Sequence, residues 1–333
     1  MSSRYSRQVV LDKIGPLGQE KLAESKVLII GCGALGTNSA NLLVRAGVGV
    51  IKIVDRDIIE LNNLQRQILF DEEDVGQAKA VTAARKLQKI NSEIEIQYLI
   101  KDINSRNIEE VIAGFDLVLD ATDNIPTRML INDVCVKHSI PWIYAGVLQT
   151  NGMVLTILPD GPCLRCLLPE IPPPGAMQTC ETAGILNAIP YIIASIESVE
   201  AIKILLKKDI ERRLIIYDVW DHRFDLIEIE KSDNCECCVS RDFKYLNEEN
   251  KEIVAGLCAN SVQIIPPADR VIDLRKIAVN LEKSVSNMIA TEFILKFRAE
   301  GKDFTIFKDG RAIIKGTGDE GVGKALYSRY LGL

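Results

Sequence analysis

The chain has 333 residues, of which 47% are hydrophobic and 26% charged, and its formal net charge is −6 at pH 7. This composition is typical of a globular protein, and it lacks the basic excess that nucleic-acid binding favours, so we expect no nucleic-acid partner. The first residues contain no apolar signal segment, and the longest apolar stretch, Ile185–Leu206, is interrupted by a proline and two glutamates. We therefore expect a buried helix there, no membrane partner and a cytoplasmic location.

Strand-like and helix-like patterns alternate through the first half of the chain. Apolar runs typical of strands lie at Val27–Ile30, Val50–Val54, Ile94–Leu99 and Leu117–Asp120, with helical patterns between them at Thr37–Ala46 and Lys79–Ile90. Further strands are expected at Trp142–Ala145, Met153–Leu158, Leu214–Asp218 and Asp225–Ile229. The alternation predicts a doubly wound, Rossmann-like α/β fold, with a largely parallel sheet and helices on both faces.

A glycine-rich turn, GCGALG, follows the first predicted strand at residues 31–36. It matches G-x-G-x-x-G, in which glycines let the backbone turn tightly and let a phosphate approach the N-terminus of the next helix. Asp55 ends the second predicted strand about 20 positions further on, the spacing of a carboxylate that accepts a hydrogen bond from a ribose hydroxyl. The motif predicts a nucleotide site, but alone it does not separate NAD from ATP.

The segments that follow favour a triphosphate. NNLQRQ supplies Arg66 and GQAK supplies Lys79, and both cations suit the phosphoryl oxygens of ATP. LVLDATDN is an apolar strand with a polar tip that contains Asp123, and a carboxylate at such a strand end can hold Mg²⁺. A helix is expected directly after it, at Pro126–Val136.

The chain has nine cysteines, which in a cytoplasmic setting point to metal binding or catalysis rather than to disulfides. Two C-x₂-C pairs predict one tetrahedral zinc site with four thiolate ligands. The predicted ligands are Cys163, Cys166, Cys235 and Cys238. Cys237 is an alternative ligand, and we choose Cys238 because its spacing repeats that of the first pair.

A segment without regular periodicity, residues 159–184, contains the first cysteine pair and Cys180. Loops of this length are usually functional or disordered. Cys180 lies outside both pairs and precedes a helix expected near Thr182, where a helix N-terminus can lower the pKa of a thiol. A reactive thiol and a thiol with no role both fit this position.

The sequence also predicts how the chain divides. Residues 1–240 form the nucleotide-binding domain, 241–260 a polar linker, and 261–333 a small C-terminal α+β unit. In this unit we expect a helix at Asp273–Lys283, a hairpin that turns at Asp309-Gly310, and a final helix from near Asp319.

The motifs together resemble one family. They are RYSRQ at residues 4–8, GCGALG, VDRD, NLQRQ, GQAK, DATDN, the two cysteine pairs and TCETAG. From Arg4 to about Cys238 the chain is similar to the ThiF/MoeB/HesA family, the prokaryotic relatives of ubiquitin-activating E1 enzymes. The resemblance implies that the loop binds ATP, not NAD. It also implies an adenylyltransferase that activates the C-terminal glycine of a small ubiquitin-like sulfur carrier protein with a Gly-Gly tail, releasing pyrophosphate. The pathway, thiamine (thiazole) or molybdopterin biosynthesis, stays open.

The resemblance also implies roles for individual residues. Asp55 would bind the ribose, Arg66 and Lys79 the phosphates, and Asp123 the Mg²⁺, while Arg7 would reach the ATP site of the other subunit in a homodimer. The ATP-binding residues expected are Gly31, Gly33, Ala34, Gly36, Asp55, Asp57, Asn63, Arg66, Gln67, Lys79, Asp123 and Asn124. The family often has glycine where this chain has Ala34. The cysteine at position 180 links covalently to the carrier in some members and is dispensable in others.

Three other functions are weighed on the residues. One is an adenylating enzyme of the same fold that acts on a peptide or on a tRNA-bound carboxylate, although the acidic chain makes tRNA less attractive. Another is an NAD-dependent dehydrogenase, which the set Arg66, Lys79 and Asp123 disfavours. The last is a catalytically silent subunit that only binds a ubiquitin-like partner, which the presence of every expected ATP-binding residue disfavours.

Overall fold

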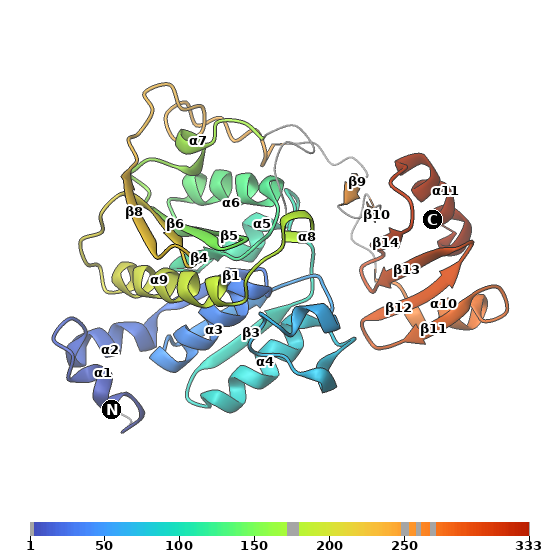
Figure 1. Ribbon diagram of the computed structural model, residues 1–333, viewed down its shortest axis with the longest axis horizontal. Helices are drawn as coiled ribbons and strands as arrows, with labels where there is room; N and C mark the ends of the chain where they lie inside the picture. The colour runs from blue at the N-terminus through green and yellow to red at the C-terminus, as the bar shows by residue number, and fades with distance from the viewer. Residues whose placement is uncertain (1–2, 172–179, 248–252, 258–260, 267–270, 333) are drawn as a thin grey trace. The chain divides into compact units, whose positions relative to one another are not determined.

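The computed structural model describes residues 3–171, 180–247, 253–257, 261–266 and 271–332 (Figure 1). The chain folds into two compact units, Met1–Glu248 and Glu249–Leu333. Within the described residues, no helix is both long and apolar enough to cross a membrane.

The first unit is built on an eight-stranded sheet with the order β3-β2-β1-β4-β5-β6-β7-β8. Its strands are β1 (Lys26–Ile30), β2 (Val50–Val54), β3 (Glu95–Leu99), β4 (Leu117–Asp120), β5 (Trp142–Leu148), β6 (Asn151–Ile157), β7 (Arg213–Asp218) and β8 (Arg223–Glu228). Neighbours from β3 to β5 pair in parallel, and those from β5 to β8 pair antiparallel. The doubly wound α/β prediction is confirmed.

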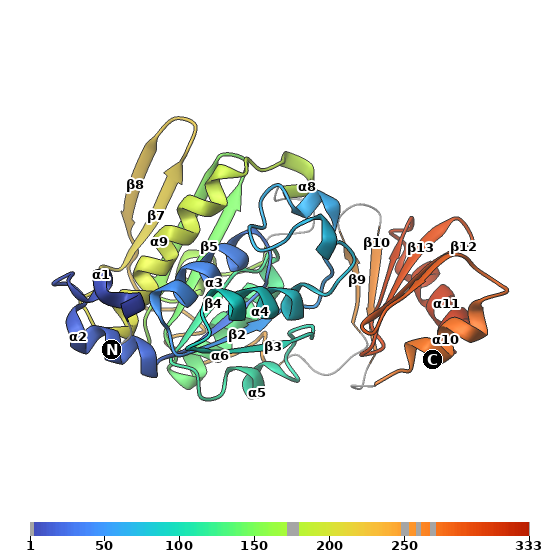
Figure 2. The same cartoon turned by 90° about the horizontal axis from the view of Figure 1, so that it is seen from below.

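Helices cover both faces of this sheet (Figures 1 and 2). The α-helices are α1 (Ser6–Val9), α2 (Gly15–Glu24), α3 (Ala34–Ala46), α4 (Lys79–Ile90), α5 (Ile108–Ile112), α6 (Ile125–His138), α7 (Leu164–Leu167), α8 (Cys180–Ala183) and α9 (Ala188–Leu205). The described residues also contain the short 3₁₀ helices η1 (Ser3–Tyr5), η2 (Leu61–Asn63) and η3 (Glu72–Asp74). α3 begins three residues before the predicted Thr37, because Gly33 serves as its N-cap. α8 already includes Cys180, which was expected to precede it.

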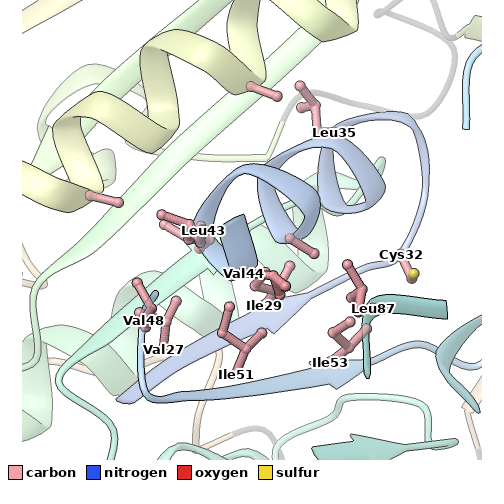
Figure 3. Close-up of a cluster of buried hydrophobic side chains, with 14 of the residues drawn as sticks. Val27, Ile29, Cys32, Leu35, Leu43, Val44, Val48, Ile51, Ile53 and Leu87 are labelled. Atoms are coloured by element: carbon pink, nitrogen blue, oxygen red, sulfur yellow. The ribbon is translucent and has the colours of Figure 1, made fainter. Parts of the chain in front are cut away.

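The alternation of side chains along β1 divides the core into two layers. Val27 and Ile29 pack with α3, α4 and α9, whereas Leu28 and Ile30 pack with α5 and α6. Figure 3 shows the first layer, in which side chains of α3 and α4 cover those of β1 and β2. Because β1 is buried on both faces, its run KVLII is continuously apolar after the first residue, as expected for a central parallel strand.

The register brings the carboxyl ends of the parallel strands to one edge. Ile30 lies opposite both Val54 and Asp120, and Val54 lies opposite Leu99. The chain leaves β1 toward β2 on one side, while β4 lies on the other side of β1. Ligands of open α/β sheets bind at such a reversal of strand order, outside the carboxyl ends of the strands.

The second unit is a six-stranded antiparallel sheet with the order β11-β12-β13-β14-β10-β9 and two helices. Its elements are β9 (Ile253–Leu257), β10 (Ser261–Ile265), α10 (Leu274–Leu281), β11 (Ser286–Ala290), β12 (Ile294–Ala299), β13 (Lys302–Phe307), β14 (Ala312–Lys315) and α11 (Glu320–Leu331). The predicted α+β character is confirmed, and β13 and β14 form the hairpin around Asp309-Gly310. Asp319 caps α11 by accepting a hydrogen bond from the Val322 N–H.

The segment expected as a linker, residues 241–260, is partly structured. Phe243, Tyr245 and Leu246 pack into the core layer that contains α6. Further along, Ile253–Leu257 pairs with β10 as β9. The polar composition of the segment hid the first feature, because Phe243, Tyr245 and Leu246 pack against residues of α6 that are distant in sequence.

Candidate nucleotide site and cysteine cluster

The glycine loop lies between β1 and α3, and two of its glycines are required by space. A Cβ on Gly31, whose φ is +98°, would lie 2.4 Å from the Ala121 carbonyl oxygen, and a Cβ on Gly36 would lie 2.1 Å from the Gly31 carbonyl oxygen. Gly33 occupies the N-cap position of α3, and no side chain accepts a hydrogen bond from the first N–H groups of the helix. These N–H groups therefore remain available to an anion. Ala34 is the first residue of α3, and its methyl group is accommodated there.

Asp55 lies directly beneath this loop. Its Oδ2 accepts a hydrogen bond from the Cys32 N–H at 2.6 Å, and its Oδ1 accepts one from the Asp57 N–H at 2.6 Å. Each carboxylate oxygen has a second lone pair, so both can still accept from ribose hydroxyls. These two hydrogen bonds from backbone N–H groups fix the Asp55 carboxylate beside the glycine loop, where a carboxylate that binds ribose would have to lie.

Lys79 begins α4 and is buried beside these acids. Its Nζ lies 3.7 Å from Asp57 Oδ2, and its backbone N–H donates to the Asp57 carbonyl oxygen. Burial alone would lower the pKa of Lys79, but Asp55 and Asp57 outweigh burial and raise it, and Asp123 adds to the effect. The Lys79 ammonium group is therefore charged and is held at the carboxyl ends of the parallel strands.

The segment NNLQRQ forms η2 and the turn after it. Asn63 is buried, and its Oδ1 accepts from the Glu60 N–H at 3.1 Å, so this side chain organises the turn. Arg66 Nη1 donates to the Asn62 carbonyl oxygen at 2.9 Å. Gln67 is 3% exposed, and its Oε1 has no hydrogen-bond partner within the described residues. Its side-chain nitrogen would lie 4.0 Å from a Cβ on Gly33, so Gln67 borders the glycine loop.

The loop after β4 is clamped by an arginine that the sequence did not single out. Arg128, on α6, donates to the Thr122 carbonyl oxygen at 2.6 Å and to the Ala145 carbonyl oxygen at 3.2 Å. Its Nε lies 3.2 Å from Oδ2 of the fully buried Asp120, which also accepts from the Thr122 N–H. This network fixes the backbone that carries Asp123.

Asp123 and Asn124 have different roles in the fold. Asn124 caps α6, because its Oδ1 accepts from the Thr127 N–H at 3.0 Å. Asp123 is exposed at the same sheet edge, and its charge acts on Lys79 and on Arg56. An exposed carboxylate next to the glycine loop suits Mg²⁺, which binds through one or two carboxylates and substrate phosphates.

Arg7 lies away from this site within its own chain. Gln8 donates to the Ala46 carbonyl oxygen at 2.8 Å, and the Asn91 side chain donates to the Tyr5 hydroxyl at 2.7 Å. These bonds hold the N-terminal segment against the C-terminal end of α3, about 20 Å from the glycine loop at 1.5 Å of rise per residue. The exposed Arg7 is therefore not brought together with the other predicted residues.

The structure brings together the four predicted zinc ligands. Cys163 Sγ lies 3.6 Å from Cys235 Sγ, and Cys166 Sγ lies 3.5 Å from Cys238 Sγ, with all four sulfur atoms within 4.8 Å of one another. Tetrahedral zinc with bonds of about 2.3 Å places its sulfur ligands about 3.8 Å apart, so the spacing fits. Burial raises the pKa of Cys238 to about 12, and Cys235 and Cys166 add to this shift, which a bound cation would reverse.

Cys237 is used differently. It is fully buried, and the Asn132 side chain on α6 donates to its sulfur at 3.2 Å, while Asn132 Oδ1 accepts from the Leu164 N–H at 2.8 Å. Asn132 thus joins both cysteine segments to α6. The backbone of Cys180 begins α8, and its side chain lies outside the described part of the structure.

The fold and the site define a nucleotide-binding α/β protein with a cluster of four cysteines. The chain belongs to the ThiF family, whose model matches residues 5–239. It is 39% identical to the sulfur carrier protein ThiS adenylyltransferase of Bacillus subtilis, over the full length of both chains. It is 37% identical to a sulfur carrier protein adenylyltransferase of Thermus thermophilus, over 71% of this chain and 90% of the other.

A solved structure is similar to the first unit. The crystal structure of Escherichia coli MccB with ATP matches with a TM-score of 0.61 and 25% identity, covering 72% of this chain and 75% of the other. The family match ends at residue 239, whereas the alignment with the B. subtilis protein includes the second unit.

Proposed function

We propose that this protein uses ATP and Mg²⁺ to adenylate the C-terminal glycine of a small ubiquitin-like sulfur carrier protein. The single observation that carries the proposal is the 39% identity, over both full lengths, to an adenylyltransferase of the sulfur carrier ThiS. The site supports it, because the glycine loop, Asp55, Lys79 and Asp123 converge at one edge of the sheet. The reaction would supply activated carrier for sulfur transfer in thiamine or molybdopterin biosynthesis.

Different residues of the site would bind different parts of ATP. The N-terminus of α3 receives phosphate, Asp55 receives the ribose hydroxyls, and Lys79 offsets phosphate charge from its buried position. Arg66 can turn from the Asn62 carbonyl oxygen toward the phosphates. Mg²⁺ bound at Asp123 would supply further positive charge beside the triphosphate.

The chemistry requires little from the protein beyond placement and charge. A carboxylate oxygen of the carrier attacks the α-phosphorus, the bond from that phosphorus to the bridging oxygen breaks, and pyrophosphate leaves with the electron pair. The carboxylate is ionised near pH 7, so no general base is needed. Holding two anions together and stabilising the charge on the leaving group accounts for most of the rate. No step of adenylation uses a thiol, so Cys180 would act only after it, if it links to the carrier.

We assign zinc to the four cysteines and a structural role to the site. A closed tetrahedral set of thiolates leaves no position for substrate. Zinc would fasten the segment around Cys163 to the end of the first unit. A cytoplasmic location would suit both the cysteine content, since thiols stay reduced there, and the need for ATP.

We further propose a homodimer in which Arg7 serves the partner's ATP site. The N-terminal segment of each chain holds Arg7 at the far end of α3 from its own loop, and Val10 and Leu17 nearby are 76% and 73% exposed. An arginine supplied by a second subunit can stabilise charge that develops on phosphate.

The experiment is ATP–pyrophosphate exchange with purified carrier proteins. Exchange should require a carrier that ends in Gly-Gly and should be absent with the same carrier lacking its last glycine. Exchange that depends on an unrelated peptide instead, and on no carrier, would contradict the proposed substrate and favour a peptide-adenylating enzyme.

A further inference from the structure

A buried arginine joins the two halves of the four-cysteine cluster through bonds that do not involve the cysteine sulfurs. Arg165 lies between Cys163 and Cys166, and its side chain is only 3% exposed. Its Nη1 donates to the Asp242 carbonyl oxygen at 2.9 Å, and its Nη2 donates to the Glu236 carboxylate. The first cysteine segment is therefore bonded to the second at two points besides the cluster itself.

Both cysteine segments are also bonded to α6. Asp133, which is fully buried on α6, accepts a hydrogen bond at Oδ2 from the Tyr245 N–H at 2.9 Å, and its Oδ1 lies 3.7 Å from Arg165 Nη1. The Arg165 guanidinium lies over the Tyr245 ring, 5.5 Å from the ring centroid. Asn132, the preceding residue of α6, is hydrogen-bonded to both cysteine segments. These side chains form one polar network that connects α6 with the two segments.

The same segments bury apolar side chains in the core layer that contains α6. Leu164 is 2% exposed, and Phe243, Tyr245 and Leu246 are each 9% exposed or less. Small metal-binding units such as zinc fingers fold only when the metal binds, so that their binding free energy is also folding free energy. The cysteine segments of this chain have a core and a polar network of their own, so their folding does not need the free energy of metal binding.

We propose that Arg165, Asn132 and Asp133 preassemble the cysteine cluster, so that zinc enters and leaves a site that is already folded. The three are positioning residues, because none of them is a proposed ligand and they act through the segments that carry the ligands. Zinc would then stabilise an existing structure, as any ligand of the folded state does. This inference rests on the assignment of zinc to the four cysteines, and it goes beyond the adenylation reaction.

The test compares zinc-loaded and metal-free full-length protein by hydrogen–deuterium exchange, measured by mass spectrometry on peptides that cover residues 232–247. Zinc is removed with a chelator in the presence of a thiol reductant, so that the cysteines stay reduced. In wild type, amides of this segment, such as that of Tyr245, should stay protected from exchange after zinc is removed. Loss of this protection in metal-free wild type, while the rest of the first unit stays protected, overturns the inference, because the segment would then need the metal to fold.

Two variants remove parts of the polar network and keep the side-chain size nearly constant. Asn132→Leu and Arg165→Met should each lose the protection of residues 232–247 in the metal-free protein. Both should bind zinc about 10–100-fold more weakly than wild type, measured by competition with a chromophoric chelator. Arg165→Lys should recover part of the zinc affinity, because an ammonium group can still pair with Asp133. Glu109→Gln breaks an exposed ion pair with Lys137 on the same helix, and as the matched control it should bind zinc like wild type.

Unchanged zinc affinity in both Asn132→Leu and Arg165→Met also overturns the inference. A wild-type protein whose segment stays protected but which binds no zinc contradicts the assignment of the metal and not the preassembly of the segments. Failure of wild type to adenylate any carrier contradicts the proposed function alone, because neither the exchange measurement nor the zinc affinity depends on the carrier.

Discussion

A buried glutamate on α9 makes stability depend on pH in a direction that can be measured. Glu197 is fully buried between α9 and α3, and its Oε2 accepts a hydrogen bond from the Ser39 hydroxyl. Its Oε1 has no hydrogen-bond partner within the described residues. Burial raises the pKa of Glu197 from 4.5 to about 8; the Ser39 hydrogen bond opposes this shift, and the nearby Asp120 adds to it. The perturbation is Glu197→Gln, a neutral side chain of nearly the same shape.

The direction and the magnitude of the expected stability change follow from this pKa shift. Between pH 4.5 and about 8, the native protein holds a proton that the unfolded chain has lost. The contribution of Glu197 to the free energy of unfolding therefore falls as pH rises through this window, by about 1.4 kcal/mol per pH unit. Glu197→Gln lacks this titration, so its advantage over wild type should grow by about 5 kcal/mol from pH 4.5 to pH 9. The extra amide donor of glutamine adds a constant cost of about 1–3 kcal/mol at every pH.

Wild type and Glu197→Gln are unfolded with denaturant at intervals from pH 4.5 to pH 9. Unfolding is monitored by a spectroscopic signal that reports on the first unit. Glu20→Gln, a change of an exposed glutamate on α2, is the control and should leave a nearly constant difference from wild type. If the stability difference between Glu197→Gln and wild type does not change with pH, Glu197 does not keep its proton in the folded protein.

Three further predictions concern the site. Asp123→Asn removes the proposed Mg²⁺ ligand, so it should abolish carrier-dependent ATP–pyrophosphate exchange and leave thermal unfolding unchanged. Near-normal exchange at ordinary Mg²⁺ concentrations would contradict that assignment. Elemental analysis of unchelated protein should find one zinc per chain, which Cys238→Ser should lower and Cys237→Ser should retain; zinc that follows Cys237 instead would reverse the choice of ligand. Arg7→Ala and Asp123→Asn proteins should each be nearly inactive, and subunit exchange between them should restore activity at one site per mixed dimer, whereas no recovery despite demonstrated exchange would place Arg7 outside the partner's site.

The nucleotide loop could be predicted because its sequence motif is local. Gly31 lies in the turn after β1 and Gly36 in the first turn of α3, and β1 itself has a continuous apolar pattern. Asp55 and Asp123 could be found because each follows a recognisable strand, and parallel strands end at one edge. The α+β character of the second unit could be predicted from its hairpin and helices.

The contacts that complete the site depend on strand order and could not be predicted. Arg56 and Asp102 are 46 positions apart in the sequence, and they meet only because β2 and β3 are neighbours. Arg128 reaches the Ala145 carbonyl oxygen because β4 and β5 pair. A single charged residue in a helix pattern looks like a solvated surface charge until its distant partner is known. The position of Arg7 at the far end of α3 likewise required the packing of the N-terminal segment.

The central claim is that the carboxyl terminus of a sulfur carrier becomes joined to AMP at this site. The most direct measurement is intact-mass spectrometry of a Gly-Gly-tailed carrier after incubation with the protein, ATP and Mg²⁺, with pyrophosphatase present. We predict a carrier heavier by one adenylyl group, formed with wild type and absent with Asp123→Asn. A carrier of unchanged mass in a reaction that nonetheless consumes ATP would contradict it.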